Sequence, residues 1–354
     1  MIEKFSRFFN NCYLSLSDSI FGITPYIGYP HNGNIGDETL YRLAISNLNK
    51  ARLISDLSSR GRLLNISLHF SNNHYLIGGG SLLFGDEFFK KLFKLESIGL
   101  TPVLWGTGSR ELPKDIESQK KWSILLQHSQ GAVRGFETAK SLEKIGVKNE
   151  VIGDMGFLLS LNYPEIFVST GKVVLIPRLI DKSHPDLFEM DIMRLELLKK
   201  LILKLYSNGI KMVIYLPCKD DYRNLKDWIL DIDQYQIPIF FYNNDDQEFF
   251  DLVKDANVII SMRMHPGIFG YSLGVPTIFL ESRPKYYDVI SVLDQKPKIV
   301  DVTNISSTEL FELAVNYFQL SNHSRICQKT NAINIATKQL DFSRKIETIL
   351  VKKT

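Results

Sequence analysis

Residues 256–288 read ANVIISMRMHPGIFGYSLGVPTIFLESRPKYYD, and this stretch decides the fold class. The apolar run that ends at Ser261 has the length and composition of a buried strand. Pro266 and Gly267 then begin a helix of small residues, since proline is favoured in the first helical turn. A second apolar run, PTIFLES, follows closely. This succession of buried strand, helix and buried strand is typical of parallel α/β architecture.

Apolar runs of strand length alternate with helical stretches on both sides of this segment. One set comprises ITPYIGYP, ARLISDL, HYLIGGG, TPVLWGTG, GAVRG and EVIGD, and the second comprises KVVLIPR, KMVIYLP, IPIFFYN, VIISMRM and PTIFLES. Helices are predicted near 37–48, 87–97, 136–145 and 186–207. We therefore predict an α/β protein with two Rossmann-like parallel-sheet domains that face a cleft.

The alternation of apolar runs and helical stretches becomes less regular after Asp154, through LNYPEIFVSTGK. We take this segment as the domain boundary. The prediction is a first domain over 1–165, a second over 166–325, and a C-terminal helix over 326–354. That helix either packs back on the first domain or mediates pairing between copies of the chain.

Composition limits the classes of function. The chain has 354 residues, of which 44% are hydrophobic and 23% charged, as in a folded protein with an ordinary core. Its net charge of +3 predicts no nucleic-acid partner and makes any anion site a local one. The three cysteines lie far apart without metal-ligand spacing, which favours reduced thiols and a cytoplasmic location.

Membrane insertion is not expected, because no apolar run reaches the roughly 20 residues that span a bilayer. The aromatic, weakly basic residues 1–22 have a second interpretation, a surface helix that makes peripheral contact with a membrane or a partner.

The strongest candidate site follows the strand of the opening stretch. Arg263 and His265 are two residues apart, so in extended geometry both side chains point to the same side. A permanent cation and an imidazole that titrates near neutrality can hold an anion or transfer a proton. The alternative for His265 is a buried, hydrogen-bonded histidine, although burying Arg263 beside it without an anion would be costly. Lys285 adds a third positive charge or is an ordinary solvated lysine.

A glycine-containing loop, YPHNGNIGDETL, provides further candidates. Gly33 and Gly36 allow tight turns and close approach of a ligand, which leaves Asn34 and Asp37 to bond sugar hydroxyls or to transfer protons. The alternative is that Asp37 only stabilises the first turn of a helix through the helix dipole.

A second glycine-rich loop lies in HYLIGGGSLLFGDEFF. Gly79, Gly80 and Ser81 are candidate ligands there, because consecutive glycines expose amide donors that suit a phosphate, a carboxylate or a sugar ring. The motif is neither a P-loop nor GxGxxG. A tight turn that requires positive φ is the alternative.

Arg134 ends a short strand in GAVRGFETAKSLEKIGV, immediately before a helix. Its guanidinium and the amides of the helix end suit a carboxylate or phosphate, and the alternative is an ion pair with Glu137 or Asp154. The histidines and cysteines show no zinc-ligand spacing, so we predict no metal site.

In this order, the quoted pieces resemble the polysaccharide pyruvyl transferase family. The resemblance rests on NGNIGDETL, the strand leading to IGGGSLL, VRGFETAKSLEKIGV with VIGDMGFLL, and SMRMHPGIFGYSLGVPTIFL with Lys285 beyond it. It covers about residues 25–290, and its most specific element is Ser-x-Arg-x-His. Gly135 departs from the family, which often has an acidic residue there.

The resemblance implies a GT-B-like fold and an enzyme that needs no cofactor. Such an enzyme transfers pyruvate from phosphoenolpyruvate to a sugar of a cell-surface polysaccharide, such as an exopolysaccharide or a capsule, or to its precursor. The product is a ketal, and phosphate is released. Arg134, Arg263 and His265 would belong to the phosphoenolpyruvate site, and Asp37 to the acceptor side in the first domain.

Several alternatives stay open at this point. The acceptor is polymeric, nucleotide-linked or lipid-linked. A lipid-linked acceptor would place the protein at the inner face of the membrane. The chain is a monomer or an oligomer. Two rival functions are a GT-B glycosyltransferase that uses a nucleotide sugar and a non-catalytic sugar-binding relative.

Overall fold

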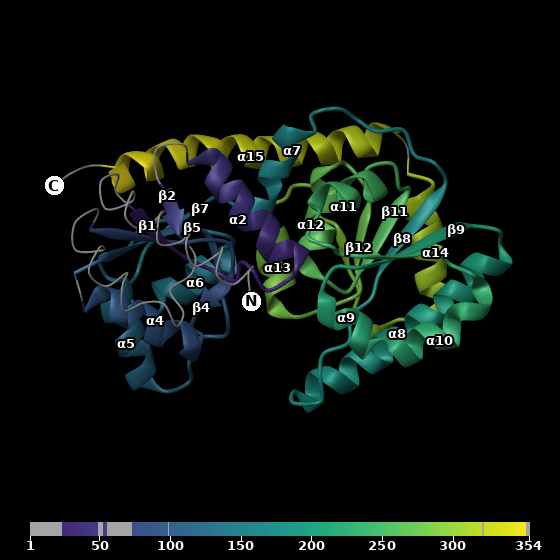
Figure 1. Cartoon of the computed structure of the whole chain (residues 1–354), viewed down its shortest axis with the longest axis horizontal. Coiled ribbons are helices and arrows are strands. Elements are labelled where there is room, and N and C mark those ends of the chain that lie inside the picture. Colours follow the sequence, from purple (N-terminus) through teal and green to yellow (C-terminus); the bar gives the residue numbers. More distant parts are fainter. Residues whose placement is uncertain (1–22, 49–51, 55–72, 98, 321, 352–354) are drawn as a thin grey trace, which may run out of the picture. The chain divides into compact units, whose positions relative to one another are not determined.

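The computed structural model describes residues 23–48, 52–54, 73–97, 99–320 and 322–351. These residues form two compact units, each built around a parallel sheet (Figure 1). Unit 1 contains the described residues within 1–29, 40–155 and 338–354, and unit 2 contains residues 30–39 and 156–337. The predicted α/β class with two parallel-sheet domains is confirmed. The interpretation of residues 1–22 as a surface helix lies outside the described residues.

Unit 1 has a seven-stranded sheet in the order β2-β1-β3-β5-β6-β7, with β4 paired to β5, and its strand pairings are parallel. The strands are β1 Ile23–Ile27, β2 Arg52–Ile54, β3 His74–Ile77, β4 Gly80–Leu83, β5 Thr101–Ser109, β6 Gln130–Val133 and β7 Glu150–Val151. The helices are α2 Ile35–Asn47, which begins in unit 2, α4 Asp86–Glu96, α5 Ile116–Leu126 and α6 Phe136–Glu143. Side chains of α4, α5 and α6 pack together with the sheet in one apolar cluster.

Unit 2 has a six-stranded parallel sheet in the order β10-β9-β8-β11-β12-β13. Numbered within the unit, this is the doubly wound order 3-2-1-4-5-6 of Rossmann domains. The strands are β8 Lys172–Ile176, β9 Lys211–Leu216, β10 Ile239–Phe241, β11 Val258–Ser261, β12 Thr277–Phe279 and β13 Lys298–Ile299.

The helices of unit 2 cover both faces of its sheet. They are α7 Leu159–Asn162, α8 Pro185–Ser207, α9 Lys219–Asn224, α10 Lys226–Ile232, α11 Asp246–Val253, α12 Met264–Ser272, α13 Pro284–Ile290 and α14 Ser307–Phe318, with 3₁₀ turns at Met155–Leu158, Asp233–Tyr235 and Val302–Asn304. Side chains of α8, α10 and α14 form one apolar cluster with the sheet, and those of α11 and α12 form another.

Helix α8 illustrates how the sequence sets these elements. Leu195, Leu198, Ile202 and Leu205 recur every three or four residues and are buried, as expected for an amphipathic helix. The helix ends at Ser207, and Gly209 takes the left-handed conformation (φ +68°) that favours glycine after a helix.

The C-terminal helix α15, Asn322–Val351, contributes to the cores of both units. In unit 2, Ala332 and Ile335 pack in a cluster with residues of α12 and α13. In unit 1, Gln339 accepts a hydrogen bond from the Trp105 indole at 2.6 Å and donates one to the Gly153 carbonyl at 2.6 Å. None of the described helices combines the length and apolar character needed to cross a membrane.

Candidate functional site

The strand order of unit 2 reverses between β8 and β11, and ligands of open parallel sheets bind beyond the carboxyl ends of the strands at such a point. Arg263 and His265 directly follow β11. Arg263 is the N-cap residue of α12, and no side chain caps this helix end. The positive end of the helix dipole and two basic side chains therefore occupy the same position in the fold.

The loop that precedes α2 is part of the same unit. The Ile35 amide donates to the Pro217 carbonyl at 3.0 Å, and Asn34 forms an isolated antiparallel bridge with Cys218. The Ile35 side chain is buried in the cluster that contains Phe269 of α12. These contacts hold the first turn of α2 against the carboxyl end of β9.

Asp37 lies in this first turn, close to His265. A Cβ atom built on Gly36 would lie 2.5 Å from Nδ1 of His265, so the imidazole packs directly on the backbone. Burial raises the pKa of the Asp37 carboxyl, whereas the positive charges of His265, Lys285 and Arg263 act in the opposite direction. The structure thus brings together Asp37, Arg263, His265 and Lys285, which we call the Asp37–His265 site.

His265 is 9% exposed, and its ring stacks on Phe269 at a centroid distance of 6.1 Å and an angle of 18°. The side chain of Asn32 donates to Oδ2 of Asp37 at 2.9 Å. The predicted ligand Asn34 has a structural role, because its Oδ1 accepts from the Gly36 amide at 2.9 Å and so caps α2.

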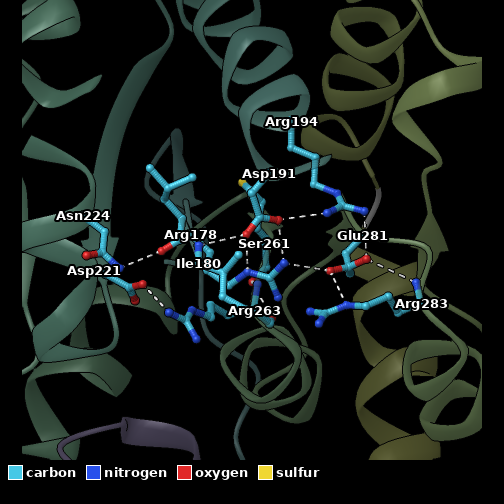
Figure 2. Close-up of polar contacts among 12 residues, drawn as sticks. Arg178, Ile180, Asp191, Arg194, Asp221, Asn224, Ser261, Arg263, Glu281 and Arg283 are labelled. Carbon is cyan, nitrogen blue, oxygen red and sulfur yellow. Dashed lines mark hydrogen bonds and ion pairs between the residues drawn. The ribbon is translucent and has the colours of Figure 1, made fainter. Parts of the chain in front are cut away.

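Arg263 is held by residues on two sides. Its amide donates to Ser261 Oγ at 3.1 Å, and the Ser261 hydroxyl donates to the Arg263 carbonyl at 2.6 Å. Its guanidinium pairs with Asp221, the third residue of α9 (Figure 2). Burial raises the pKa of the Asp221 carboxyl, and the charge of Arg263 opposes that shift.

Asp221 was not predicted as a site residue. The available signal was the pair Asp220-Asp221 shortly after the apolar strand KMVIYLP. Lys285, in contrast, is a predicted site residue and lies in the first turn of α13, where its Nζ is 5.5 Å from the centroid of the Tyr286 ring.

Arg134 belongs to unit 1 and has no exposed surface. Its NH1 lies 3.8 Å from Oδ2 of Asp154, and its NH2 donates to Ser81 Oγ at 3.2 Å. A Cβ atom on Gly108 would lie 2.2 Å from NH2 of Arg134, so this glycine makes room for the guanidinium. Asp154 is one of the two alternative partners that the sequence suggested, and this buried pair favours a structural role for Arg134.

The glycine-rich segment before Ser81 differs from an exposed ligand loop. Gly79 and Gly80 are buried, and Gly80 begins β4 with φ +103°. A Cβ atom on Gly79 would lie 2.7 Å from Cδ1 of Leu40, and one on Gly78 would lie 2.1 Å from the Tyr26 hydroxyl. The space left by the missing side chains is therefore filled by Leu40 and Tyr26.

No group of three His, Cys, Asp or Glu side chains suited to a metal ion occurs among the described residues.

The doubly wound parallel sheet of unit 2, with basic side chains at its switch point, defines an α/β protein with a candidate anion site. The chain belongs to the polysaccharide pyruvyl transferase family, whose model matches residues 15–284. A search among curated proteins gives no significant match.

Three solved structures show the same fold. The UDP-GlcNAc 2-epimerase of Neisseria meningitidis bound to UDP-GlcNAc is 13% identical with a TM-score of 0.57, over 94% of this chain and 100% of that one. S. aureus MnaA with UDP is 10% identical with a TM-score of 0.62, over 94% and 99%. A glycosyltransferase from Rickettsia africae is 13% identical with a TM-score of 0.58, over 94% and 100%.

Proposed function

We propose that the protein transfers the pyruvyl group of phosphoenolpyruvate to a sugar of a polysaccharide or its precursor, forming a ketal and releasing phosphate. The proposal is supported by the Asp37–His265 site, in which the charges of three basic side chains act on one carboxyl at the switch point of a member of this family. Phosphoenolpyruvate carries a carboxylate and a phosphate, and basic side chains with a helix N-terminus suit both groups.

Each residue has a role in the proposed reaction. A proton is delivered to C3 of the enol, a sugar hydroxyl attacks C2, the C2–O bond to phosphate breaks, and a second hydroxyl closes the ring. His265 delivers the proton or holds the phosphate, and Arg263 and Lys285 hold the anionic groups. Asp37 accepts a proton from the attacking hydroxyl or orients that hydroxyl.

The direct test is incubation with phosphoenolpyruvate and a panel of glycans, with free phosphate and the mass of the glycan as readouts. We expect a stoichiometric release of phosphate and a mass gain that matches a pyruvate ketal. In H265A the turnover should fall by about a hundredfold to ten-thousandfold, since that is the usual contribution of a general acid or base. A near-normal rate for H265A would contradict the role assigned to His265.

A nucleotide-sugar glycosyltransferase is the second candidate. It is favoured by two of the similar structures, which contain UDP-GlcNAc or UDP. Arg263 and Lys285 would then hold a diphosphate instead of phosphoenolpyruvate. Release of UDP from a UDP-sugar, without any phosphate from phosphoenolpyruvate, would favour this candidate.

A further inference from the structure

A buried network of arginines and carboxylates lies beside Arg263 at the carboxyl ends of β8 and β12 (Figure 2). Asp191 accepts from Nε of Arg178 at 2.8 Å and from NH1 of Arg194 at 2.9 Å. Glu281 accepts from NH2 of Arg178 at 3.1 Å and from NH2 of Arg194 at 2.9 Å. These four side chains hold one another in fixed positions and are at most 6% exposed.

Glu281 has a further partner, Arg283, which lies nearer the surface with a 26% exposed side chain. Oε2 of Glu281 accepts from Nε of Arg283 at 2.7 Å, and Oε1 accepts from the Arg283 amide at 3.2 Å. The NH2 nitrogen of Arg283 is buried and has no hydrogen-bond partner in the described structure. A buried donor on a permanent cation is costly when it lacks an acceptor, which points to a missing ligand.

Arg263 also has a buried guanidinium nitrogen without a hydrogen-bond acceptor among the described residues. Its NH2 pairs with Asp221, whereas its Nε is buried and, within the described residues, lacks an acceptor. The buried Tyr286 hydroxyl donates to the carbonyl of Met262, which directly precedes Arg263, at 2.9 Å, and the charges of Arg283 and Arg263 both act on this hydroxyl. The two incompletely bonded guanidinium groups therefore lie near one buried hydroxyl.

We propose that Arg283 is a second arginine ligand for the phosphate group of the donor, and that Glu281 is the positioning residue that holds it. The proposal rests on the proposed function, because it assigns that substrate's phosphate. A phosphate accepts hydrogen bonds from several directions, so donors from two loops fit it better than they fit a planar carboxylate. Arg178 and Arg194 hold the Glu281 carboxylate through hydrogen bonds, so Glu281 keeps Arg283 oriented before the ligand binds.

The test is the affinity of the full chain for inorganic phosphate, measured by titration calorimetry. R283Q removes the charge and the fork of donors but leaves Glu281 with two arginine partners, so the unit should still fold. We expect the Kd for phosphate to rise about tenfold to a hundredfold, the loss of a charge-assisted hydrogen bond. R283K, which keeps the charge without the fork, should fall between R283Q and the wild type.

R223Q is the matched control, because Arg223 lies in the same unit with a 77% exposed side chain paired to Asp220. Its phosphate affinity should equal that of the wild type, and the melting temperatures without ligand should agree for all variants. A Kd of R283Q within about twofold of the wild type, or a wild type without saturable phosphate binding, overturns the inference. Weaker phosphate binding by R283Q, combined with no phosphate release from phosphoenolpyruvate by the wild type, supports Arg283 as a phosphate ligand and contradicts phosphoenolpyruvate as the source of that phosphate.

Discussion

Burial in the fold opposes ionisation of the Asp37 carboxyl, whereas the neighbouring positive charges favour it. Burial raises its pKa from 3.8, and the charges of His265, Lys285 and Arg263 offset part of that effect. A group with a raised pKa binds its proton more tightly in the folded state than in the unfolded state. Ionised Asp37 therefore lowers the stability of the folded chain at neutral pH.

We expect D37N to be more stable than the wild type at pH 7. The difference should shrink as the pH falls through the raised folded pKa toward 3.8, because the wild-type carboxyl then becomes neutral as well. The amide introduced by this substitution would retain an oxygen that accepts from Asn32. Turnover should fall by about a hundredfold or more if Asp37 acts in proton transfer. Urea unfolding at a series of pH values measures the first effect, and lower stability of D37N at pH 7 would show that burial does not dominate.

Asp37, Arg263, His265 and Lys285 are candidates from the sequence because each follows a strand or begins a helix, and their roles stay predictions. The sequence did not identify Asp221 or Arg283. The contacts of Asp221 with Arg263 and of Arg283 with Glu281 depend on which strands are neighbours in the sheet, and no local pattern contains that information.

The first turn of α2 is the element on which the Asp37–His265 site depends. Gly36 is needed there for its size, since a Cβ atom would lie 2.5 Å from the His265 imidazole. Asn34 caps this turn, and the Ile35 side chain joins the apolar core of unit 2.

G36A is expected to impair activity more than stability. Alanine is about 1 kcal/mol more favourable than glycine inside a helix, which offsets part of the steric cost. The displaced imidazole should reduce kcat by about a hundredfold, as a misplacement of about 1 Å can do. S46A, on the exposed part of α2, is the control and should keep wild-type activity. Full activity of G36A would show that the imidazole position is not critical.

Helix α8 carries the charges that fix the arginine network. Burial opposes ionisation of Asp191, yet hydrogen bonds and charges from Arg178 and Arg194 hold its pKa below the usual value. D191A should therefore lower the free energy of unfolding by about 3–5 kcal/mol, because two buried arginines lose their partner. D231A removes an exposed pair with Lys199 at 2.7 Å and should cost less than about 1 kcal/mol. If urea unfolding showed the same decrease in the free energy of unfolding for D191A and D231A, this ranking would be contradicted.

The elements themselves were largely predictable. The expected helices near 37–48, 87–97, 136–145 and 186–207 are present as α2, α4, α6 and α8. Strand β4 was missed because Gly78, Gly79 and Gly80 indicate a loop locally, and only packing against Tyr26 and Leu40 explains them.

At the scale of the whole molecule, neither unit is one continuous segment. The chain passes from one unit to the other after residues 29, 39, 155 and 337. The sequence pattern indicates only one domain boundary, near Asp154, where the alternation of strands and helices is interrupted. Residues 30–39 join unit 2 through long-range contacts such as the bond from Ile35 to Pro217, which no local signal predicts.

Ligand binding should appear in the stability of the whole chain, because a ligand that binds only the folded state stabilises it by RT ln(1 + [L]/Kd). At a hundredfold excess over Kd this is about 2.7 kcal/mol, or about 3–4 °C in Tm for a chain of this length. We expect phosphoenolpyruvate to produce this shift in the wild type and a smaller one in H265A, and UDP-GlcNAc to produce none. The opposite result, a shift with UDP-GlcNAc alone, would contradict the phosphoenolpyruvate proposal and favour a nucleotide sugar, since stabilisation requires differential binding to the folded state.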